Sequence, residues 1–434
     1  MAGTAGTPGT PRVLRAMNDR AALDLLLEHG PLSRTRIGKL TGLSKPTASQ
    51  LLARLEAAGL VLATGTSEGR PGPGAQLYSV NPAAAYAAGL DVTPARIRAA
   101  VADVTGRTVG EYELPVPGRR ASPGPAAACG PRTAASPVVR QVTDALDGAV
   151  KAAGLARDDV HRLVIGTPGA FDPGTGRLRY ASHLPGWHSP TLLDELAAAL
   201  PMPVEYENDV NLVAVAEQRL GAARGHRDFV LLWNQEGLGA ARGHRDFVLL
   251  WNQEGLGAAL VLGGRLHRGW TGGAGEVGFL PVPGAPLVRK VTRANSGGYQ
   301  ELAGSQALPE LARELGVGDL PAGPYAEVAA ALVARAADHA GGPYRELLRT
   351  YATRLATGLA SLVSVLDPEL VVLSGTSLTA GGEVLRGLVQ GELEELAASR
   401  PRLVVGDVTD HPVLRGALES ALAATRDEVF DTSR

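Results

Sequence analysis

The residues from Ser33 to Leu60 form a pattern that few folds satisfy, because it predicts two helices separated by only three residues. Ser33 can cap a short helix over 34–40, and Ser44 can cap a second helix with Pro46 tolerated in its first turn. The apolar positions of the second helix recur at helical spacing and define its buried face: Ala48, Leu51, Leu52 and Leu55. This spacing predicts a helix-turn-helix unit whose second helix turns a polar face outward.

The residues that follow the second helix predict a β-hairpin. Strand patterns at 60–62 and 76–80 are joined by a Gly- and Pro-rich loop over 64–74, which is typical of a wing. An earlier stretch with apolar residues near helical spacing predicts one more helix before the unit. We therefore expect a winged helix-turn-helix domain over residues 12–81, preceded by a disordered tail over 1–11.

The polar face of the second helix carries side chains of the types that read DNA. Gln pairs with adenine, Lys with guanine or phosphate, and Ser or Thr with either. The candidates for DNA binding are Ser44, Lys45, Thr47, Ser49, Gln50 and Arg54. Arg70 is a further candidate at the tip of the wing, because an extended arginine can enter a narrow minor groove. The alternative for each residue is an ordinary solvated surface position.

The distribution of charge agrees with this interpretation. Residues 1–80 carry nine Lys and Arg against five Asp and Glu, a balance of +4, so the remaining residues carry −6 if the total is −2. A basic small domain on an acidic large one suits nucleic-acid binding by the small part. The chain contains no apolar run of about 18 residues, which is the length that a membrane-spanning helix needs. We find no secretory signal and a single cysteine, Cys129, and expect a cytoplasmic protein.

The rest of the chain, residues 82–434, alternates strand and helix patterns. Apolar alternation over 88–104 predicts a hairpin, and residues 163–165 predict a buried strand that ends in a Gly-Thr-Pro-Gly turn at 166–169. A Pro-, Ala- and Gly-rich stretch over 115–137 predicts a loop insertion. Because strands and helices continue to alternate, the expected fold class is α/β.

One segment of the chain occurs twice without a change. Residues 222–239 read AARGHRDFVLLWNQEGLG, and residues 240–257 repeat them. Structural repeats usually diverge and recur several times, so two identical copies indicate a recent in-frame duplication or an artefact. Each copy predicts one apolar strand. We expect the second copy in the core sheet and the first extruded as a loop or added at an edge. Pairing of the first copy with residues 259–263 would contradict this expectation.

The chain resembles the ROK family of repressors, open reading frames and sugar kinases, and within it the regulators of the xylose-repressor and N-acetylglucosamine-repressor type. The resemblance covers nearly the whole chain after Pro11. It rests on Ser33-Arg34, Thr41-Gly42-Leu43-Ser44-Lys45-Pro46-Thr47, Ala58-Gly59-Leu60-Val61, Gly69-Arg70-Pro71, Gly166-Thr167-Pro168-Gly169, Leu184-Pro185-Gly186-Trp187, Glu207-Asn208-Asp209-Val210-Asn211 and Gly273-Ala274-Gly275-Glu276-Val277-Gly278. The resemblance implies a winged helix-turn-helix followed by a two-lobed, actin-like (sugar kinase or ribonuclease H-like) ATPase-fold domain, here 82–434. It also implies a sugar bound in the cleft and assembly of the chain with itself, as a dimer or tetramer.

Two phosphate loops characterise the family's kinases, and both are altered here. The Asp-x-Gly-Gly-Thr loop is replaced by residues 91–96, where both glycines are missing and Pro94 has no N–H to donate. In the second loop, Glu254 places a carboxylate where phosphate oxygens would lie, and like charges repel. Asp209 matches the family's catalytic base, but a sugar-binding carboxylate explains it equally. We therefore expect no ATP turnover, no catalytic residue and no cofactor.

The resemblance also implies a ligand site, since carboxylates and amides bind adjacent sugar hydroxyls. The implied ligand-binding residues are Gly169, Asn208, Asp209, Glu276 and Glu301. Phe279 replaces a histidine that in the family contacts sugar and ligates zinc, and residues 293–299 lack the family's cysteine cluster, so we expect no metal site. The alternatives are an acidic helix N-cap at 207–209 and surface carboxylates at Glu276 and Glu301.

Three functions fit these observations. The first is a repressor of carbohydrate-related genes that binds double-stranded operator DNA and responds to a carbohydrate-like effector in a non-catalytic cleft. The second is a sugar kinase that carries a DNA-binding domain, against which the altered phosphate loops argue. The third is an effector-independent DNA-binding oligomer, which Phe279 and the missing cysteine cluster leave open. We favour the first.

Overall fold

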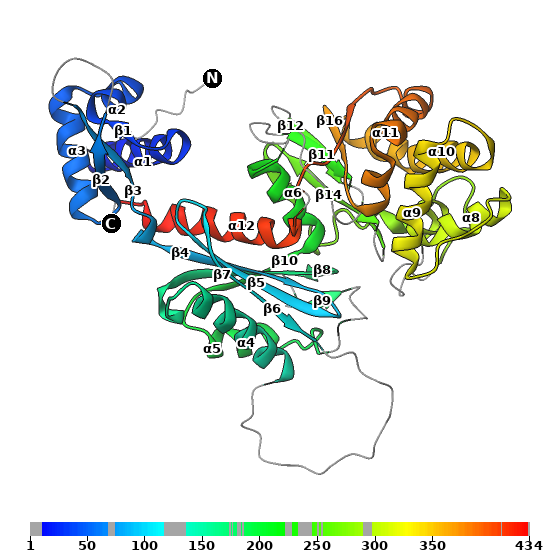
Figure 1. Cartoon of the computed structure of the whole chain (residues 1–434), viewed down its shortest axis with the longest axis horizontal. Coiled ribbons are helices and arrows are strands. Elements are labelled where there is room, and N and C mark those ends of the chain that lie inside the picture. Colours follow the sequence, from blue (N-terminus) through cyan, green and yellow to red (C-terminus); the bar gives the residue numbers. More distant parts are fainter. Residues whose placement is uncertain are drawn as a thin grey trace, which may run out of the picture.

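Three units follow one another along the chain in the computed structural model (Figure 1). The structure describes residues 11–67, 74–116, 136–172, 175, 177–179, 184, 186–221, 228–232, 245–249, 251–252, 255–289, 297–408 and 410–432. A small domain at the N-terminus precedes two lobes, here called lobe 1 and lobe 2. The last helix, α12 (Pro412–Val429), returns from lobe 2 and lies along lobe 1. Within the described part of the chain, no helix is long and apolar enough to cross a membrane.

The small domain is a winged helix-turn-helix, as predicted. Its elements are α1 (Pro11–His29), β1 (Leu32–Ser33), α2 (Arg34–Thr41), α3 (Lys45–Ala57), β2 (Val61–Thr66) and β3 (Gln76–Val80). The Ser33 hydroxyl accepts from the Arg36 N–H at 3.3 Å, and the Ser44 hydroxyl accepts from the Thr47 N–H at 3.4 Å. Gly42, with φ of 71°, supplies the left-handed residue that ends α2. No pattern in the sequence predicted β1, which adds a third strand by pairing with β3.

Lobe 1 is a five-stranded sheet in the order β10-β7-β4-β5-β6. Its elements are β4 (Tyr86–Val92), β5 (Arg96–Asp103), β6 (Thr108–Pro115), α4 (Pro137–Ala152), β7 (Val160–Thr167), β8 (Ala170–Asp172), β9 (Arg177–Arg179), α5 (Leu192–Ala199), β10 (Val204–Asn208) and α6 (Asp209–Arg219). Helices α4 and α5 cover one face and α12 covers the other (Figure 1). Most of the predicted insertion over 115–137 lies outside the described residues, between the end of β6 and the start of α4.

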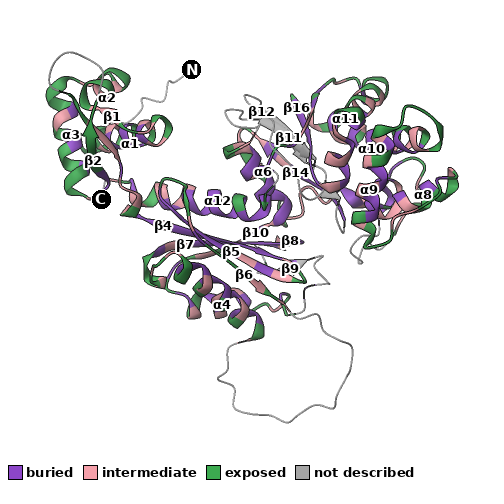
Figure 2. Cartoon of the chain, viewed as in Figure 1, coloured by how far each residue is buried: buried purple, intermediate pink, exposed green. Residues whose placement is uncertain are grey.

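Lobe 2 joins a mixed sheet to a group of helices. Its elements are β11 (Asp228–Leu232), β12 (Arg245–Leu249), β13 (Trp251–Asn252), β14 (Leu256–Leu262), β15 (Arg265–His267), α7 (Gly298–Ala303), α8 (Leu308–Glu314), α9 (Tyr325–Asp338), α10 (Gly342–Leu366), β16 (Leu370–Leu373), α11 (Thr376–Leu396) and β17 (Arg402–Val405). Figure 2 shows how the buried residues lie along the faces where helices and sheets meet. The α/β class and the two-lobed kinase-like architecture are confirmed.

Both copies of the repeated segment pair within the sheet of lobe 2, so the expectation that the first copy is extruded or at an edge is wrong. In the first copy, Val230 pairs with Leu260 of β14 and with Val371 of β16. Val248, its equivalent in the second copy, has the same two partners. The outer edges of β14 and β16 are taken by β15 and β17. Because a strand has only two edges, identical segments compete for one position, and sequence could not rank them.

We expect a chain with a single copy to keep this sheet, because one strand fills the position between β14 and β16. Deletion of 222–239 and deletion of 240–257 give the same protein. Removing one copy shortens a connection, which alters its closure entropy by less than about 1 kcal/mol. Differential scanning calorimetry should therefore give an unfolding midpoint equal to or above that of the full chain. A single-copy chain that fails to fold would show that both copies are needed.

Candidate DNA-binding surface and ligand cleft

Helix α3 presents the predicted DNA-binding face to solvent. Ser44, Lys45, Thr47 and Gln50 are exposed, and Ser49 is half-buried. Two hydroxyls serve the helix itself: Ser44 caps it, and Ser49 donates to the Lys45 carbonyl at 2.9 Å. Lys45 and Gln50 therefore remain as the best placed side chains for phosphate and base contacts. Arg70 lies outside the described residues, so its role stays a prediction.

Arg54, the last DNA-binding candidate of α3, is tied to the interior of its own domain. Its guanidinium donates to the carboxylate of Asp19 on α1 at 2.6 Å. Asp19 is only 3% exposed, and its second oxygen accepts from the Thr432 hydroxyl at 3.1 Å. If Arg54 contacted DNA, its guanidinium would have to do so while it stays paired with Asp19. This arrangement could not be predicted from the sequence, because Asp19 is distant along the chain from both Arg54 and Thr432.

We expect Gln50→Ala to weaken binding to one specific DNA sequence by roughly 1–3 kcal/mol, the usual value of a bidentate base contact. Lys45→Ala should weaken binding to all sequences and reduce its dependence on salt. Fluorescence anisotropy with labelled duplexes at several salt concentrations measures both effects. Glu56→Ala, an exposed change near the other end of α3, is the matched control. If Gln50→Ala and Glu56→Ala behave alike, this face does not read bases.

The candidate ligand site, here called the cleft, comprises the start of α6 after β10 and the turn that carries Glu276. Asn208 caps α6, because its side-chain oxygen accepts from the Asn211 N–H at 3.2 Å. Its amide group donates to the Gly169 carbonyl at 3.0 Å. Gly169 has φ of 92°, a conformation that favours glycine. Asn208 and Gly169 are thus held together, and the amide keeps further capacity for hydrogen bonds; their role in ligand binding stays a prediction.

Three carboxylates come together beside the start of α6. Burial raises the pKa of Asp209 well above its usual range, and the nearby carboxylates of Asp91 and Glu276 raise it further. Burial also raises the pKa of Glu276 to about 7. Protonated carboxyls can donate as well as accept, which suits a ligand rich in hydroxyls. Sequence analysis treated Asp91 only as part of an altered phosphate loop and missed its place in the cleft.

A glycine-rich turn after β15 carries Glu276 and contacts both lobes. A Cβ at Gly272 would lie 2.0 Å from the Phe171 carbonyl of lobe 1, and one at Gly275 would lie 1.8 Å from the Ala258 carbonyl of lobe 2. Both glycines also have positive φ, of 76° and 96°. Any larger residue would force the turn away from the sheet. Glycine is therefore required at both positions to hold Glu276 in the cleft.

Glu301 does not join this cluster. It is exposed on α7 and borders a surface hollow with Glu310, Glu314 and Arg354. Its neighbour Gln300 is only 2% exposed, and its side-chain oxygen accepts from the Leu256 N–H of β14. The Gln300 NH₂ group is buried and has no hydrogen-bond partner among the described residues. The polar side chain that points inward from α7 is thus Gln300, and not Glu301, the residue that the motif match indicated.

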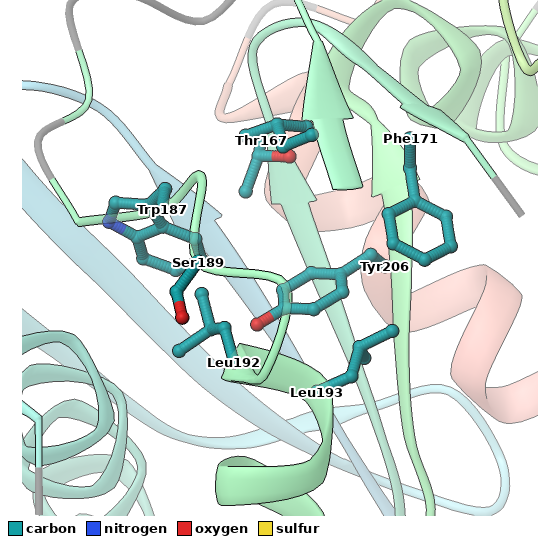
Figure 3. Close-up of a pocket in the computed structure, with 8 residues that line it drawn as sticks. Thr167, Phe171, Trp187, Ser189, Leu192, Leu193 and Tyr206 are labelled. Carbon is teal, nitrogen blue, oxygen red and sulfur yellow. The ribbon is translucent and has the colours of Figure 1, made fainter. Parts of the chain in front are cut away.

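A small pocket in lobe 1 adjoins the end of β7 (Figure 3). It is lined by Thr167, Phe171, Leu178, Trp187, Ser189, Leu192, Leu193 and Tyr206. The ring of Tyr206 lies 5.8 Å from that of Phe171 and 6.1 Å from that of Trp187. The hydroxyls of Thr167 and Tyr206 are buried without a partner in the described part of the chain. Because an unpaired buried hydroxyl costs about 1–3 kcal/mol, both are placed to receive a water or a ligand group.

The hairpin between β4 and β5 uses its own hydrogen-bonding groups. The Thr93 N–H and hydroxyl both donate to the Arg96 carbonyl at 2.9 Å, and the Arg96 N–H donates to the Thr93 hydroxyl at 3.2 Å. Pro94 and Ala95 form an exposed tip. This turn offers few free N–H groups to a phosphate. Glu254, in the second altered loop, lies outside the described residues.

The residues available do not fit the zinc site of the family. Phe279 is a half-buried hydrocarbon side chain at the end of the 3₁₀ turn Val277–Phe279, where it offers no ligand atom. Within the described ranges, no group of three His, Cys, Asp or Glu side chains is arranged to hold a metal ion. Residues 293–296 lie outside these ranges but contain no cysteine or histidine.

The fold and site define a DNA-binding domain joined to a kinase-like, two-lobed cleft. The ROK family model matches residues 89–242 and 232–424, and the MarR family model matches residues 17–69. The chain belongs to the ROK family. It is 24% identical over 382 residues to the xylose repressor of Caldicellulosiruptor bescii, with 87% of each chain covered.

Two solved structures share its fold. A ROK family transcriptional regulator, described as a homologue of the E. coli MLC protein, has a TM-score of 0.69 at 19% identity and covers 97% of this chain and 98% of its own. The ROK hexokinase of Thermus thermophilus has a TM-score of 0.58 at 25% identity, over 79% of this chain and 99% of its own. The regulator thus matches the chain with its N-terminal domain, and the hexokinase matches mainly the two lobes.

We expect Glu276 to make stability depend on pH. Its carboxyl has a pKa of about 7 when folded and an ordinary value of 4.5. Between these values the folded state binds more protons than the unfolded state, so its contribution to stability falls as pH rises from about 4.5 to about 7. Glu276→Gln should therefore gain stability relative to the native chain as pH rises through this range. Unfolding midpoints at pH 5 to 8 measure this, with exposed Glu301→Gln as control, and parallel curves for all three proteins contradict it.

Proposed function

We propose that the protein is a transcriptional repressor of carbohydrate-related genes, which binds operator DNA through α3 and releases or tightens its hold when a sugar-like effector enters the cleft. One observation carries the proposal: a helix-turn-helix with exposed Lys45 and Gln50 belongs to the same chain as a two-lobed, kinase-like fold in which the carboxyls of Asp209 and Glu276 lie near each other. Similarity to a named xylose repressor over 87% of both chains supports this combination.

The cleft suits binding without chemistry. A sugar kinase must hold the phosphates of a nucleotide as well as a base beside the sugar hydroxyl. Asp209 keeps the position of the base, but the turn at Thr93 to Arg96 is closed by its own hydrogen bonds. We therefore propose that Asp209 serves to bind a sugar hydroxyl and that the protein does not turn over ATP. Assembly into a dimer or tetramer would present two α3 helices to a palindromic operator.

The test is binding to duplex DNA from upstream of the protein's own gene at fixed salt, with and without D-xylose, D-glucose and N-acetyl-D-glucosamine. We expect specific binding whose affinity one sugar changes by about five-fold or more, the usual range of allosteric coupling. Asp209→Ala should keep the DNA affinity and lose the response to sugar, because the hydroxyl partner is gone. Glu301→Ala, exposed on α7, is the matched control and should keep both.

Other outcomes favour the other functions. Specific DNA binding that no sugar changes would indicate an effector-independent DNA-binding oligomer. Consumption of ATP that depends on a sugar and is lost in Asp209→Ala would indicate a kinase. The absence of specific DNA binding, measured on a folded protein, would contradict the proposal itself.

A further inference from the structure

Helix α12 contacts both the part of lobe 1 that carries the candidate ligand-binding residues and the buried cluster of the winged helix domain. Figure 1 shows it lying along the sheet of lobe 1 and reaching the small domain at its C-terminal end. It is 18 residues long, which corresponds to about 27 Å at 1.5 Å per residue. A helix of this length is stiff enough to transmit a displacement from one end to the other.

At its first turns, α12 packs against α6 and β7 with no space between them. A Cβ at Gly416 would lie 1.7 Å from the Leu212 carbonyl of α6. A Cβ at Gly166, in β7, would lie 2.6 Å from Val413 of α12 and 2.7 Å from the Leu212 side chain. Helix α6 starts at Asp209, directly after its cap Asn208. A shift of the cleft residues at this helix start must therefore displace α12, because close-packed interiors transmit strain.

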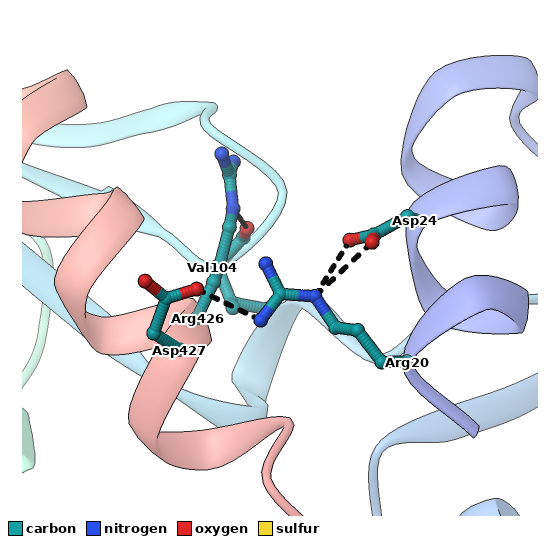
Figure 4. A network of polar contacts seen from close by, with 5 residues as sticks. All are labelled: Arg20, Asp24, Val104, Arg426 and Asp427. Carbon is teal, nitrogen blue, oxygen red and sulfur yellow. Dashed lines mark hydrogen bonds and ion pairs between the residues drawn. The ribbon is translucent and has the colours of Figure 1, made fainter. Parts of the chain in front are cut away.

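At its other end, α12 enters the core of the winged helix domain. Phe430, the residue after the helix, is 1% exposed and belongs to the same buried cluster as Leu23 and Leu26 of α1. The Arg20 guanidinium donates to Asp427 at 2.8 Å and to Asp24 at 3.0 Å, and it lies 5.8 Å from the centre of the Phe430 ring. Figure 4 shows this network between α1 and α12.

Two further contacts fix the end of α12 and the residues that follow it, one to lobe 1 and one to the small domain. Arg426 donates to the Val104 carbonyl at 2.9 Å, which fixes α12 to the end of β5 (Figure 4). Thr432 donates to Asp19 at 3.1 Å, and the other oxygen of Asp19 holds Arg54 of α3 at 2.6 Å. Arg54 of α3, the helix proposed to read DNA, and Thr432, which follows α12, thus both bind the buried carboxylate of Asp19.

We propose that α12 couples the ligand cleft to the DNA-reading helix, with the contacts of Asp427, Phe430 and Thr432 to α1 as the latch that sets the position of the winged helix domain. This inference rests on the proposed function. Movement at the start of α6 is passed to α12 through the contact of Leu212 with Gly416. It then reaches α3 through Asp19 and Arg54.

The test is a double-mutant cycle that needs no effector. Gly416→Ala perturbs α12 at the cleft end, and Asp427→Asn combined with Thr432→Val weakens the latch with no substitution in residues 11–81. We expect Gly416→Ala to change DNA affinity about three-fold or more, and much less in the latch background. Changes at such distant sites normally act independently within a factor of about two. Independent effects would overturn the proposal.

A control variant tests whether the effect is specific to the latch. Asp147→Asn breaks an ion pair of similar exposure, with Arg157 at 2.6 Å on the far side of lobe 1, and should leave the effect of Gly416→Ala unchanged. If Gly416→Ala does not fold, Val413→Ala tests the same contact by opening a cavity. The same double-mutant cycle can be measured without DNA, from the protection of α1 and α3 against amide hydrogen exchange. Failure of the proposed function alone would abolish DNA binding and leave this exchange coupling in place.

Discussion

A buried carboxylate, Glu207, holds the two lobes together at the cleft. One of its oxygens lies 2.6 Å from the guanidinium of Arg268, in the turn after β15, and the other accepts from the Asn211 side chain at 2.8 Å. Glu207 is only 8% exposed, and both of its oxygens have hydrogen-bond partners. Glu207 therefore fixes the start of α6 against the turn that carries Glu276. Through α6 this contact is also linked to α12, which packs against α6.

The same fold serves kinases and regulators, and the differences lie in a few backbone groups. A kinase needs free N–H groups where phosphates bind, whereas this chain closes the turn at Thr93 to Arg96 with internal hydrogen bonds. The sugar side of the cleft keeps its carboxylates, and their raised pKa values suit exchange of hydrogen bonds with hydroxyls. Fold alone does not decide between the two activities, and binding without phosphoryl transfer is the function that we propose.

Features encoded by neighbouring residues could be predicted, and features set by distant residues could not. The caps Ser33 and Ser44, the wing and the asparagine that starts α6 follow from local sequence. The ion pair between Arg54 and Asp19 and the place of Asp91 beside Asp209 depend on tertiary packing. On α7, the motif match selected Glu301, which is exposed, whereas its neighbour Gln300 is buried, because successive helical residues face different directions. The positions of the two repeated strands in the sheet could not be predicted for another reason, because identical sequences have identical structural preferences.

We propose that sugar binding and DNA binding are linked in one chain. Linkage is reciprocal, so a sugar that changes DNA affinity by some factor must have its own affinity changed by the same factor when DNA is bound. Isothermal titration of the sugar into the free protein and into its operator complex measures this directly. We predict two different sugar affinities, with the same ratio as the two DNA affinities. Equal sugar affinities in the presence and absence of operator DNA would contradict the account.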